Sequence, residues 1–351
     1  MKSKIYYIAE KTIKYNHAGN KARADIDDIL EKFFLKYETF NQISENEKIK
    51  KYIKIFSPLY LKKIWKLKCL KSKIIVLQYP YCYDHITKYF FNNVLKNNKT
   101  IIILHDIDSL RGLNNNNLKK EICLLNNANY IIAHNNKMTE FLKQNGFKNY
   151  ILNLTVFDYL LNKPFPKQNT ELGTNIVFAG NLSKSEFLNL KQISDLDIIF
   201  NLYGPNFGQI KNKSNNIVYK GNYNPELVPY KLEGSFGLIW DGDSLETCSG
   251  DYGKYLEYNN PHKLSLYIAA GIPVITWKGA AIADFIKKYN IGFTVNSIYE
   301  ISEIIGKMTL SEYEEYKNNL KGLQEKVCSG FFTKMALEKI IKMINQNEKS
   351  I

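Results

Sequence analysis

Short runs of β-branched and aromatic residues alternate with longer helical patterns along the chain, and this alternation constrains the fold more than any other feature. The strand-like runs lie at 4–9, 73–80, 100–105, 129–134, 150–154, 176–180, 198–204, 216–221, 235–240, 273–277 and 291–295. The helical patterns lie at 21–36, 85–98, 117–128, 136–146, 184–193, 225–232, 261–270, 281–289, 310–327 and 332–346. Apolar strands alternating with helices predict parallel sheets covered on both faces.

The alternation is interrupted once, by the polar stretch 162–175, which contains two prolines and has the composition of a linker. We therefore expect an α/β protein with two doubly wound Rossmann-like domains that face a cleft. The predicted domains are 1–160 and 161–327, followed by a C-terminal helical segment, 328–351, that packs back across the domain boundary.

The charge of the chain indicates an anionic partner. Lys and Arg number 48 against 34 Asp and Glu, which gives a formal net charge of +14. Such a balance suits phosphate-bearing ligands, nucleic acid or an anionic membrane surface. Residues 48–73 carry ten lysines and no acid, interleaved with apolar residues. We expect peripheral membrane contact there; a solvated helix face and RNA binding are the alternatives, although no motif supports nucleic acid.

The cysteines and the hydropathy pattern indicate a compartment. The five cysteines are scattered, with no CxxC pair and no zinc-finger spacing. No signal peptide is recognisable, and no stretch approaches the roughly 20 apolar residues that cross a bilayer. We expect a cytoplasmic protein, at the inner face of the cell membrane if the basic segment binds lipid, and a homo-oligomer.

The segment EYNNPHKLSLYIAAGIPVITW, 257–277, is the most informative motif. It predicts a buried helix that begins near Pro261 and runs into a buried strand. His262 and Lys263 would then lie in the first helical turn, where cations are unfavourable unless an anion faces them. A diphosphate would supply that charge; the alternative is a solvent-facing Lys263 and a His262 bonded to a neighbour.

Two other polar loops follow strands of the second domain, where parallel sheets bind ligands. In FAGNLSKSEFL, Gly180, Asn181 and Lys184 stand between a strand and a predicted helix, a place suited to an anion or to an ordinary capped turn. In WDGDS, Asp241 and Asp243 would suit either a divalent metal or Asx turns, and we expect no metal.

The first domain offers two comparable loops. His105, Asp106 and Asp108 follow the strand at 100–105 and are candidates to take a proton from a substrate hydroxyl, or simply to cap the next helix. Gly19 begins a Gly-Asn turn that allows close approach to a ligand; alternatively it is an ordinary helix start with Lys21 and Arg23 solvated.

Taken in order, the motifs HDIDSLR, VFDYLL (156–161), FAGNLSKSEFL, LYGPNF, FGLIWDGDS and YNNPHKLSLYIAAGIPVI resemble a bacterial family of GT-B glycosyltransferases. That family includes the accessory glucosyltransferases of serine-rich adhesins and β-1,6-galactofuranosyltransferases. The resemblance covers nearly the whole chain.

The resemblance implies a GT-B enzyme that moves a hexose from a UDP-sugar to a hydroxyl of a glycan acceptor, in surface polysaccharide or glycoprotein synthesis. The acceptor would be lipid-linked or on a protein. The enzyme would need no metal or other cofactor and would not bind nucleic acid. The implied donor-binding residues are Gly19, Asn20, Gly180, Asn181, Lys184, Tyr203, Asp241, Asn260, His262, Lys263 and Ser265.

One departure from related enzymes bears on the mechanism. Many retaining GT-B enzymes carry two glutamates eight positions apart before the turn that corresponds to Gly271, where this chain has Tyr258 and Leu266. We therefore expect inversion, with Asp106 as the base and His105 or Asp108 as the next candidates. The hexose, whether galactofuranose, glucose or galactose, is not readable from the sequence. A catalytically inactive GT-B-like partner subunit and a basic membrane- or nucleic-acid-binding protein are the alternatives.

Overall fold

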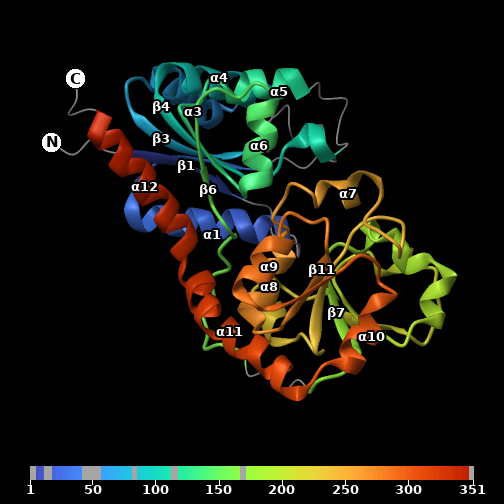
Figure 1. The fold of residues 1–351 in the computed structure, drawn as a ribbon. Helices are drawn as coiled ribbons and strands as arrows, with labels where there is room; N and C mark the ends of the chain where they lie inside the picture. Colours follow the sequence, from blue (N-terminus) through green and yellow to red (C-terminus); the bar gives the residue numbers. More distant parts are fainter. Residues whose placement is uncertain are drawn as a thin grey trace. The chain divides into compact units, whose positions relative to one another are not determined.

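The computed structural model describes residues 5–11, 18–41, 57–80, 85–111, 118–166 and 171–347. These residues form two compact units (Figure 1). Within the described ranges, the N-terminal unit contains 5–11, 23–154 and 333–347, and the C-terminal unit contains 18–22 and 155–332. The predicted domain boundary lies at residue 160, whereas the two units divide between Leu154 and Thr155. The predicted C-terminal segment begins at residue 328, whereas the C-terminal stretch of the N-terminal unit begins at Thr333.

The N-terminal unit is a parallel sheet flanked by helices. Its elements are β1 (Ile5–Lys11), most of α1 (Ala18–Phe33), β2 (Leu35–Asn41), α3 (Pro58–Cys69), β3 (Ile74–Tyr79), α4 (His85–Asn97), β4 (Lys99–Leu104), the 3-10 turn η1 (Asp108–Arg111), α5 (Leu118–Leu125), β5 (Tyr130–Ala133), α6 (Asn136–Gln144), β6 (Tyr150–Asn153) and, from Thr333 on, α12 (Phe331–Asn347). The strands of the described residues lie in the order β2-β1-β3-β4-β5-β6. Every neighbouring pair among them is parallel.

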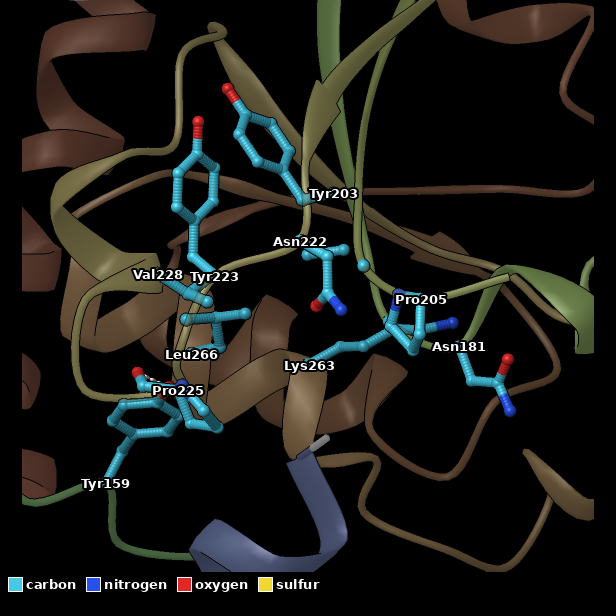
Figure 2. Close-up of a pocket in the computed structure, with 13 residues that line it drawn as sticks. Tyr159, Asn181, Tyr203, Pro205, Asn222, Tyr223, Pro225, Val228, Lys263 and Leu266 are labelled. Carbon is cyan, nitrogen blue, oxygen red and sulfur yellow. Dashed lines mark hydrogen bonds between the residues drawn. The ribbon is translucent and has the colours of Figure 1, made fainter. Parts of the chain in front are cut away.

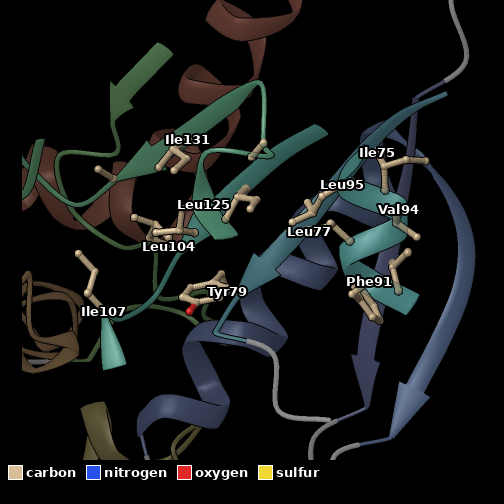
Figure 3. Close-up of a cluster of buried hydrophobic side chains, with 14 of the residues drawn as sticks. Ile75, Leu77, Tyr79, Phe91, Val94, Leu95, Leu104, Ile107, Leu125 and Ile131 are labelled. Carbon is tan, nitrogen blue, oxygen red and sulfur yellow. The ribbon is translucent and has the colours of Figure 1, made fainter. Parts of the chain in front are cut away.

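The core of this unit lies between the sheet and its helices (Figure 3). Strand β3 is buried along its whole length, and Ile75 and Leu77 face Val94 and Leu95 of α4 in the same cluster. Continuous burial of a strand on both faces is what a near-continuous apolar run predicts for a parallel sheet.

The C-terminal unit repeats the plan with its own sheet. Its elements are β7 (Asn175–Ala179), the 3-10 turns η2 (Leu182–Lys184), η3 (Glu186–Asn189) and η4 (Lys191–Asp195), β8 (Ile199–Tyr203), η5 (Phe207–Gln209), β9 (Ile217–Gly221), η6 (Val228–Tyr230), β10 (Phe236–Ile239), α7 (Gly250–Tyr255), α8 (His262–Ala270), β11 (Val274–Trp277), α9 (Ala283–Tyr289), β12 (Gly292–Val295), α10 (Glu300–Lys307), α11 (Leu310–Ser329) and the start of α12 (Phe331–Asn347). The strand order in the described residues, β12-β11-β10-β7-β8-β9, is that of a dinucleotide-binding fold, and it reverses between β7 and β10.

The predicted strands are all present, and the differences concern local elements. The helix predicted at 184–193 is wrong: the segment forms η2, η3 and η4, because the closely spaced Asn181, Ser183 and Ser185 favour caps and turns over a helix. The helix predicted at 225–232 is reduced to η6. Strand β2 was not predicted. It is the edge strand of its sheet, and its residues range from exposed Leu35 and Lys36 to buried Phe40, so it lacks a continuous apolar run.

Two glycines allow the ends of β7 and β8 to approach each other closely. Gly204 has a φ of +134°, and a Cβ there would lie 1.9 Å from the carbonyl oxygen of Gly180. Gly180 in turn donates its N–H to Tyr203 O at 2.9 Å. Since any side chain at 204 would collide with main chain, the loops after both strands depend on this glycine.

Replacing Gly204 by Ala should lower the free energy of unfolding by more than about 2 kcal/mol, because it combines a positive φ with a main-chain collision. At Gly322, inside α11, an added Cβ would meet no atom within 4 Å. Gly322→Ala should therefore raise the free energy of unfolding by about 0.5–1 kcal/mol. Urea unfolding of both variants measures the two changes, and equal effects would contradict the explanation.

Candidate active site

A pocket opens at the carboxyl ends of β7, β8 and β9 in the C-terminal unit (Figure 2). It is lined by Tyr159, Ala179, Gly180, Asn181, Tyr203, Gly204, Pro205, Asn222, Tyr223, Pro225, Val228, Lys263 and Leu266. The pocket lies beside the point where the strand order reverses, which is where open α/β sheets bind ligands. Its wall joins apolar and aromatic side chains to two amides and a lysine, a composition typical of a site for an organic anion.

Lys263 supplies the positive charge of the pocket. Its Nζ lies 2.7 Å from Oδ1 of Asp241, 3.3 Å from the carbonyl oxygen of Trp240 and 4.4 Å from the centre of the Phe178 ring. The side chains of Lys263 and Asp241 are 13% and 19% exposed. An ammonium group has three N–H donors, so one donor remains for a ligand after the contacts with Asp241 and Trp240.

Gly180 makes room for this lysine. A Cβ at Gly180 would lie 3.0 Å from Cε of Lys263, so the lysine crosses the end of β7 directly over the glycine. Residue 180 and residue 263 were both predicted as donor-binding residues, and the structure brings them together although 83 positions separate them.

Asn181 lines the same pocket, and its side-chain N–H groups have no partner among the described residues. Its Oδ1 accepts from the backbone N–H of Ser183, from the hydroxyl of Ser183 and from Nδ2 of Asn206. These three contacts identify the oxygen, and the Nδ2 group donates to no described residue. The amide is thus held through its oxygen, and its N–H groups stay available as donors.

Lys184 and Asp243, the second acid of the WDGDS motif, both contact other side chains of the C-terminal unit. Lys184 lies over the ring of Tyr252, 4.7 Å from its centre. Asp243 accepts a hydrogen bond from the hydroxyl of Ser249. In the described ranges, no group of three or more His, Cys, Asp or Glu side chains is arranged to hold a metal ion. Transfer without a metal stays a prediction.

Three predicted residues near the start of α8 bind main chain of the same unit. Asn260 donates from Nδ2 to Thr155 O at 2.9 Å, His262 donates from Nε2 to Asp158 O at 3.3 Å, and Ser265 donates to Phe157 O at 2.7 Å. Their direct contact with a donor stays a prediction. In the structure they hold the segment 155–158 along α8.

His262 is neutral in this position, so the expectation of two cations at the helix start needs correction. Its ring stacks on Tyr159 with 5.1 Å between the ring centres. Desolvation of the partly buried ring lowers the pKa of His262 to about 4. Pro261 precedes the helix as its N-cap, where we had placed it in the first turn. Lys263 is therefore the one charged member of the predicted pair.

Tyr159 occupies a central position that the sequence did not reveal. Its hydroxyl donates to Pro225 O at 2.5 Å, and its backbone N–H donates to Val327 O at 3.0 Å. Nζ of Lys21 lies 5.2 Å from the centre of the same ring. The VFDYLL motif was noticed as a familiar block, but the role of its tyrosine as a wall of the pocket was missed.

The first turn of α1 carries two further predicted residues. The helix begins at Ala18, so Gly19 and Asn20 lie inside its first turn and not in a turn that precedes it. Lys21 and Arg23, expected to be solvated if this were an ordinary helix start, are buried. Lys21 donates to Leu160 O at 2.9 Å and pairs with Glu226 at 2.7 Å, so burial is balanced by a carboxylate.

Tyr203 and Asn222 both line the pocket, but only Tyr203 was predicted. Tyr203 was predicted; its hydroxyl accepts from the backbone N–H of Glu233 at 3.0 Å, and burial raises the pKa of Tyr203 to about 12. Asn222 was missed, and its amide makes no hydrogen bond to a described residue. The sequence could have indicated Asn222 through its position in KGNYN, directly after the end of β9.

The three candidate bases lie together after β4 in the N-terminal unit. Asp106 pairs with Arg111, with 2.6 Å between Oδ2 and Nη1, and its side chain is 28% exposed. His105 lies 2.6 Å from Oε1 of Gln78, and since that oxygen accepts, Nε2 of His105 is the donor. Asp108 begins η1. The ion pair stabilises the ionised form of Asp106, which is the form a base requires.

Two buried side chains position this loop and were not predicted from sequence. Gln78, at the end of β3, donates to Asp27 Oδ1 at 2.8 Å while it accepts from His105. Glu121 on α5 accepts from the backbone N–H groups of Asp108 and Ser109 at 3.0 and 2.9 Å, and from the hydroxyl of Tyr79. The loop that carries the candidate bases is thus held from two sides.

Comparison with known proteins agrees with this architecture. Residues 5–156 match the family model described as "Glucosyltransferase 3-like, N-terminal domain", and residues 176–340 match that of the corresponding C-terminal domain. The chain is 33% identical to the β-1,6-galactofuranosyltransferase WbbI of Escherichia coli over 96% of this chain and 98% of that protein. It is 28% identical to glucosyltransferase 3 of Streptococcus gordonii over 68% of this chain and 70% of that protein.

Solved structures are similar in fold at low sequence identity. A sucrose-phosphate synthase from Thermosynechococcus elongatus has a TM-score of 0.60 and 10% identity, over 99% of this chain and all of that one. An O-GlcNAc transferase from Thermobaculum terrenum also has a TM-score of 0.60, with 12% identity over 97% of this chain and 67% of that one. The expected GT-B fold, with two doubly wound Rossmann-like units, is confirmed.

The partly buried His262 should make stability depend on pH. Between about pH 4 and 6.5 the unfolded chain binds a proton at His262 that the folded chain does not, so the contribution of His262 to stability falls as pH decreases through this window and is constant above it. The buried His134, whose pKa is also lowered to about 4, adds a slope of the same sign. His262→Phe should remove up to about 1.4 kcal/mol per pH unit of that slope. Urea unfolding at several pH values measures the slope, and an unchanged slope would show that the pKa of His262 is the same in the folded and unfolded chain.

Proposed function

Because the chain belongs to the glucosyltransferase 3-like family and is a GT-B hexosyltransferase, we propose that it transfers a hexose from a UDP-sugar to a hydroxyl group of a glycan acceptor. The observation that carries the proposal is the pocket at the ends of β7, β8 and β9, where Lys263 and Asn181 present N–H donors beside apolar walls. A nucleoside diphosphate has the matching parts, a flat base and an anionic diphosphate.

Within this pocket we assign the two parts of UDP to different walls. Tyr223, Pro225 and Val228 form an apolar and aromatic wall suited to the uracil and ribose. Lys263 and Asn181 form the polar side suited to the diphosphate. As the glycosidic bond breaks, negative charge develops on the departing diphosphate, and a lysine fixed by Asp241 stabilises that charge without first having to reorganise.

We assign galactofuranose as the first candidate for the transferred hexose, ahead of glucose and galactose. The galactofuranosyltransferase matches nearly the whole length of this chain, whereas the glucosyltransferases match about two thirds of it. The name of that relative specifies a β linkage. UDP-hexoses ordinarily hold the sugar through an α bond, so a β product requires inversion at the anomeric carbon, in keeping with the missing glutamate pair.

For inversion we propose Asp106 as the base. The acceptor hydroxyl attacks the anomeric carbon, its proton passes to the carboxylate, and UDP leaves from the opposite side of the sugar ring. Arg111 holds Asp106 in one orientation through the 2.6 Å contact. His105 is the next candidate, because Gln78 fixes its ring with Nε2 as donor.

Binding and turnover with a panel of donors test the proposal directly. UDP-galactofuranose, UDP-galactopyranose and UDP-glucose are each added to the protein, and thermal stabilisation and UDP release are followed. We expect all UDP compounds to stabilise the protein and UDP-galactofuranose to be turned over fastest. If none of the three UDP-sugars stabilised the protein, the proposal would be overturned.

Removing the charge of the pocket should weaken UDP binding. Lys263→Met combined with Asp241→Asn removes the ion pair without leaving an unpaired carboxylate, and should raise the Kd for UDP about 10- to 100-fold through loss of a charged hydrogen bond. Lys288→Met, at an exposed position of α9, is the control for charge and should leave Kd unchanged. Isothermal titration measures both, and an unchanged Kd in the double variant would place UDP elsewhere.

Asp106→Asn should reduce transfer by at least about 100-fold while the Kd for UDP changes little, since the substitution removes a proton acceptor in the other unit of the chain. His105→Gln, assayed beside it, separates the two candidates. Full turnover in Asp106→Asn together with loss in His105→Gln would assign the base to the histidine.

A further inference from the structure

Helix α3 presents an unusual outward surface in the N-terminal unit. Its inward side is apolar and packed, with Ile64 and Leu67 in the core cluster. The outward side carries large apolar residues in contact with water: Leu59 is 71%, Leu61 52% and Trp65 64% exposed. The other two tryptophans of the chain, Trp240 and Trp277, are buried and half-buried.

Lysines surround these exposed apolar residues. Leu61 and Trp65 are four positions apart and lie on one face of the helix, with Lys68 on the same face and Lys62 at its side. Lys71 and Lys73 follow directly after the helix, and all four lysines are exposed. We call Leu61, Trp65, Lys62, Lys68, Lys71 and Lys73 the α3 surface.

The lysines of α3 fall into two groups with different roles. Lys63 and Lys66 both pair with Glu38, at 3.2 and 2.9 Å, and so attach the helix to the edge strand β2. Lys62, Lys68, Lys71 and Lys73 have no carboxylate partner among the described residues. The sequence contains no acid between Lys48 and Tyr83, so the positive charge of the α3 surface is not neutralised from within its own segment.

From these observations we propose that the α3 surface docks on a bilayer that contains anionic lipid. The exposed Trp65 and Leu61 would enter the region between headgroups and acyl chains, while the lysines bind lipid phosphates at the same level. Nucleic acid would use the lysines but would leave Leu61 in water. None of the helices in the described residues is long and apolar enough to cross a membrane, and α3 has 12 residues.

The proposal does not rest on the donor or on the base. Residues 48–56, the remainder of the basic segment that suggested membrane contact, lie outside the described residues. Docking through α3 would give a transferase of this family access to an acceptor carried on a lipid, which links the surface to the choice between lipid-linked and protein-linked glycans.

Co-sedimentation of the full chain with vesicles tests the proposal. We expect binding to vesicles of phosphatidylglycerol mixed with phosphatidylcholine, little binding to phosphatidylcholine alone, and a blue shift of tryptophan emission on binding, because Trp65 is the exposed tryptophan. The double variant Lys62→Gln, Lys68→Gln should lower the partition coefficient about 25-fold, roughly fivefold for each lysine. Trp65→Ser should lower it about tenfold and abolish the blue shift.

Matched variants elsewhere control for charge and for loss of an apolar side chain. Lys287→Gln with Lys288→Gln, on exposed positions of α9, removes the same charge, and Leu310→Ser removes a 63% exposed apolar residue at the start of α11. Both controls should bind vesicles as the unaltered protein does. Equal losses in the control and α3 variants, or retention on polyuridylate without binding to anionic vesicles, would overturn the proposal.

Transfer to a soluble acceptor analogue should be unchanged in the α3 variants. This measurement separates the two ideas, because loss of vesicle binding with normal transfer supports the surface without altering the proposed function. Failure of the whole protein to use any UDP-sugar would overturn the proposed function and leave the vesicle result intact.

Discussion

The hydrogen bonds from the start of α8 to the main chain of residues 155–158 are the constraint on which the candidate donor site depends. Asn260, His262 and Ser265 each bind one carbonyl of that segment. The bonds are largely shielded from water. A carbonyl left without a donor in such surroundings would cost free energy, so these bonds favour one path for the segment. That path ends with Tyr159 as a wall of the pocket.

Charge in the pocket is concentrated in a single lysine with a fixed partner. Desolvation lowers the pKa of the partly buried His262 to about 4, so the start of α8 carries one positive charge where the sequence offered two. Asp241 holds Lys263 near the strand ends and partly compensates it in the absence of ligand. A cation that is already oriented is well suited to stabilise charge on a leaving group, because little reorganisation is required when the charge appears.

The strands, and several of the polar residues that meet at the pocket, were readable from sequence because each rests on local information. Runs such as 100–105 and 273–277 are apolar on both faces, and such a pattern is typical of few structures other than a buried parallel strand. Gly180, Asn181 and Lys263 could be selected because they follow strands or begin a helix. The failures were also local: the helix expected at 184–193 ignored how strongly Asn181, Ser183 and Ser185 favour turns, and edge strand β2 lacked a continuous apolar run.

By itself, the sequence determined that the chain is a pair of parallel α/β units with basic, phosphate-suited loops at strand ends, since periodicity and turn residues are properties of neighbours in the chain. Only the tertiary structure decided what each polar side chain binds. Lys21 and Glu226 are 205 positions apart, and Lys263 and Asp241 belong to different elements, yet each pair is joined at 2.7 Å. Such partners are chosen by packing between distant segments, and the same packing lowers the pKa of His262 while it brings Lys263 and Asp241 together.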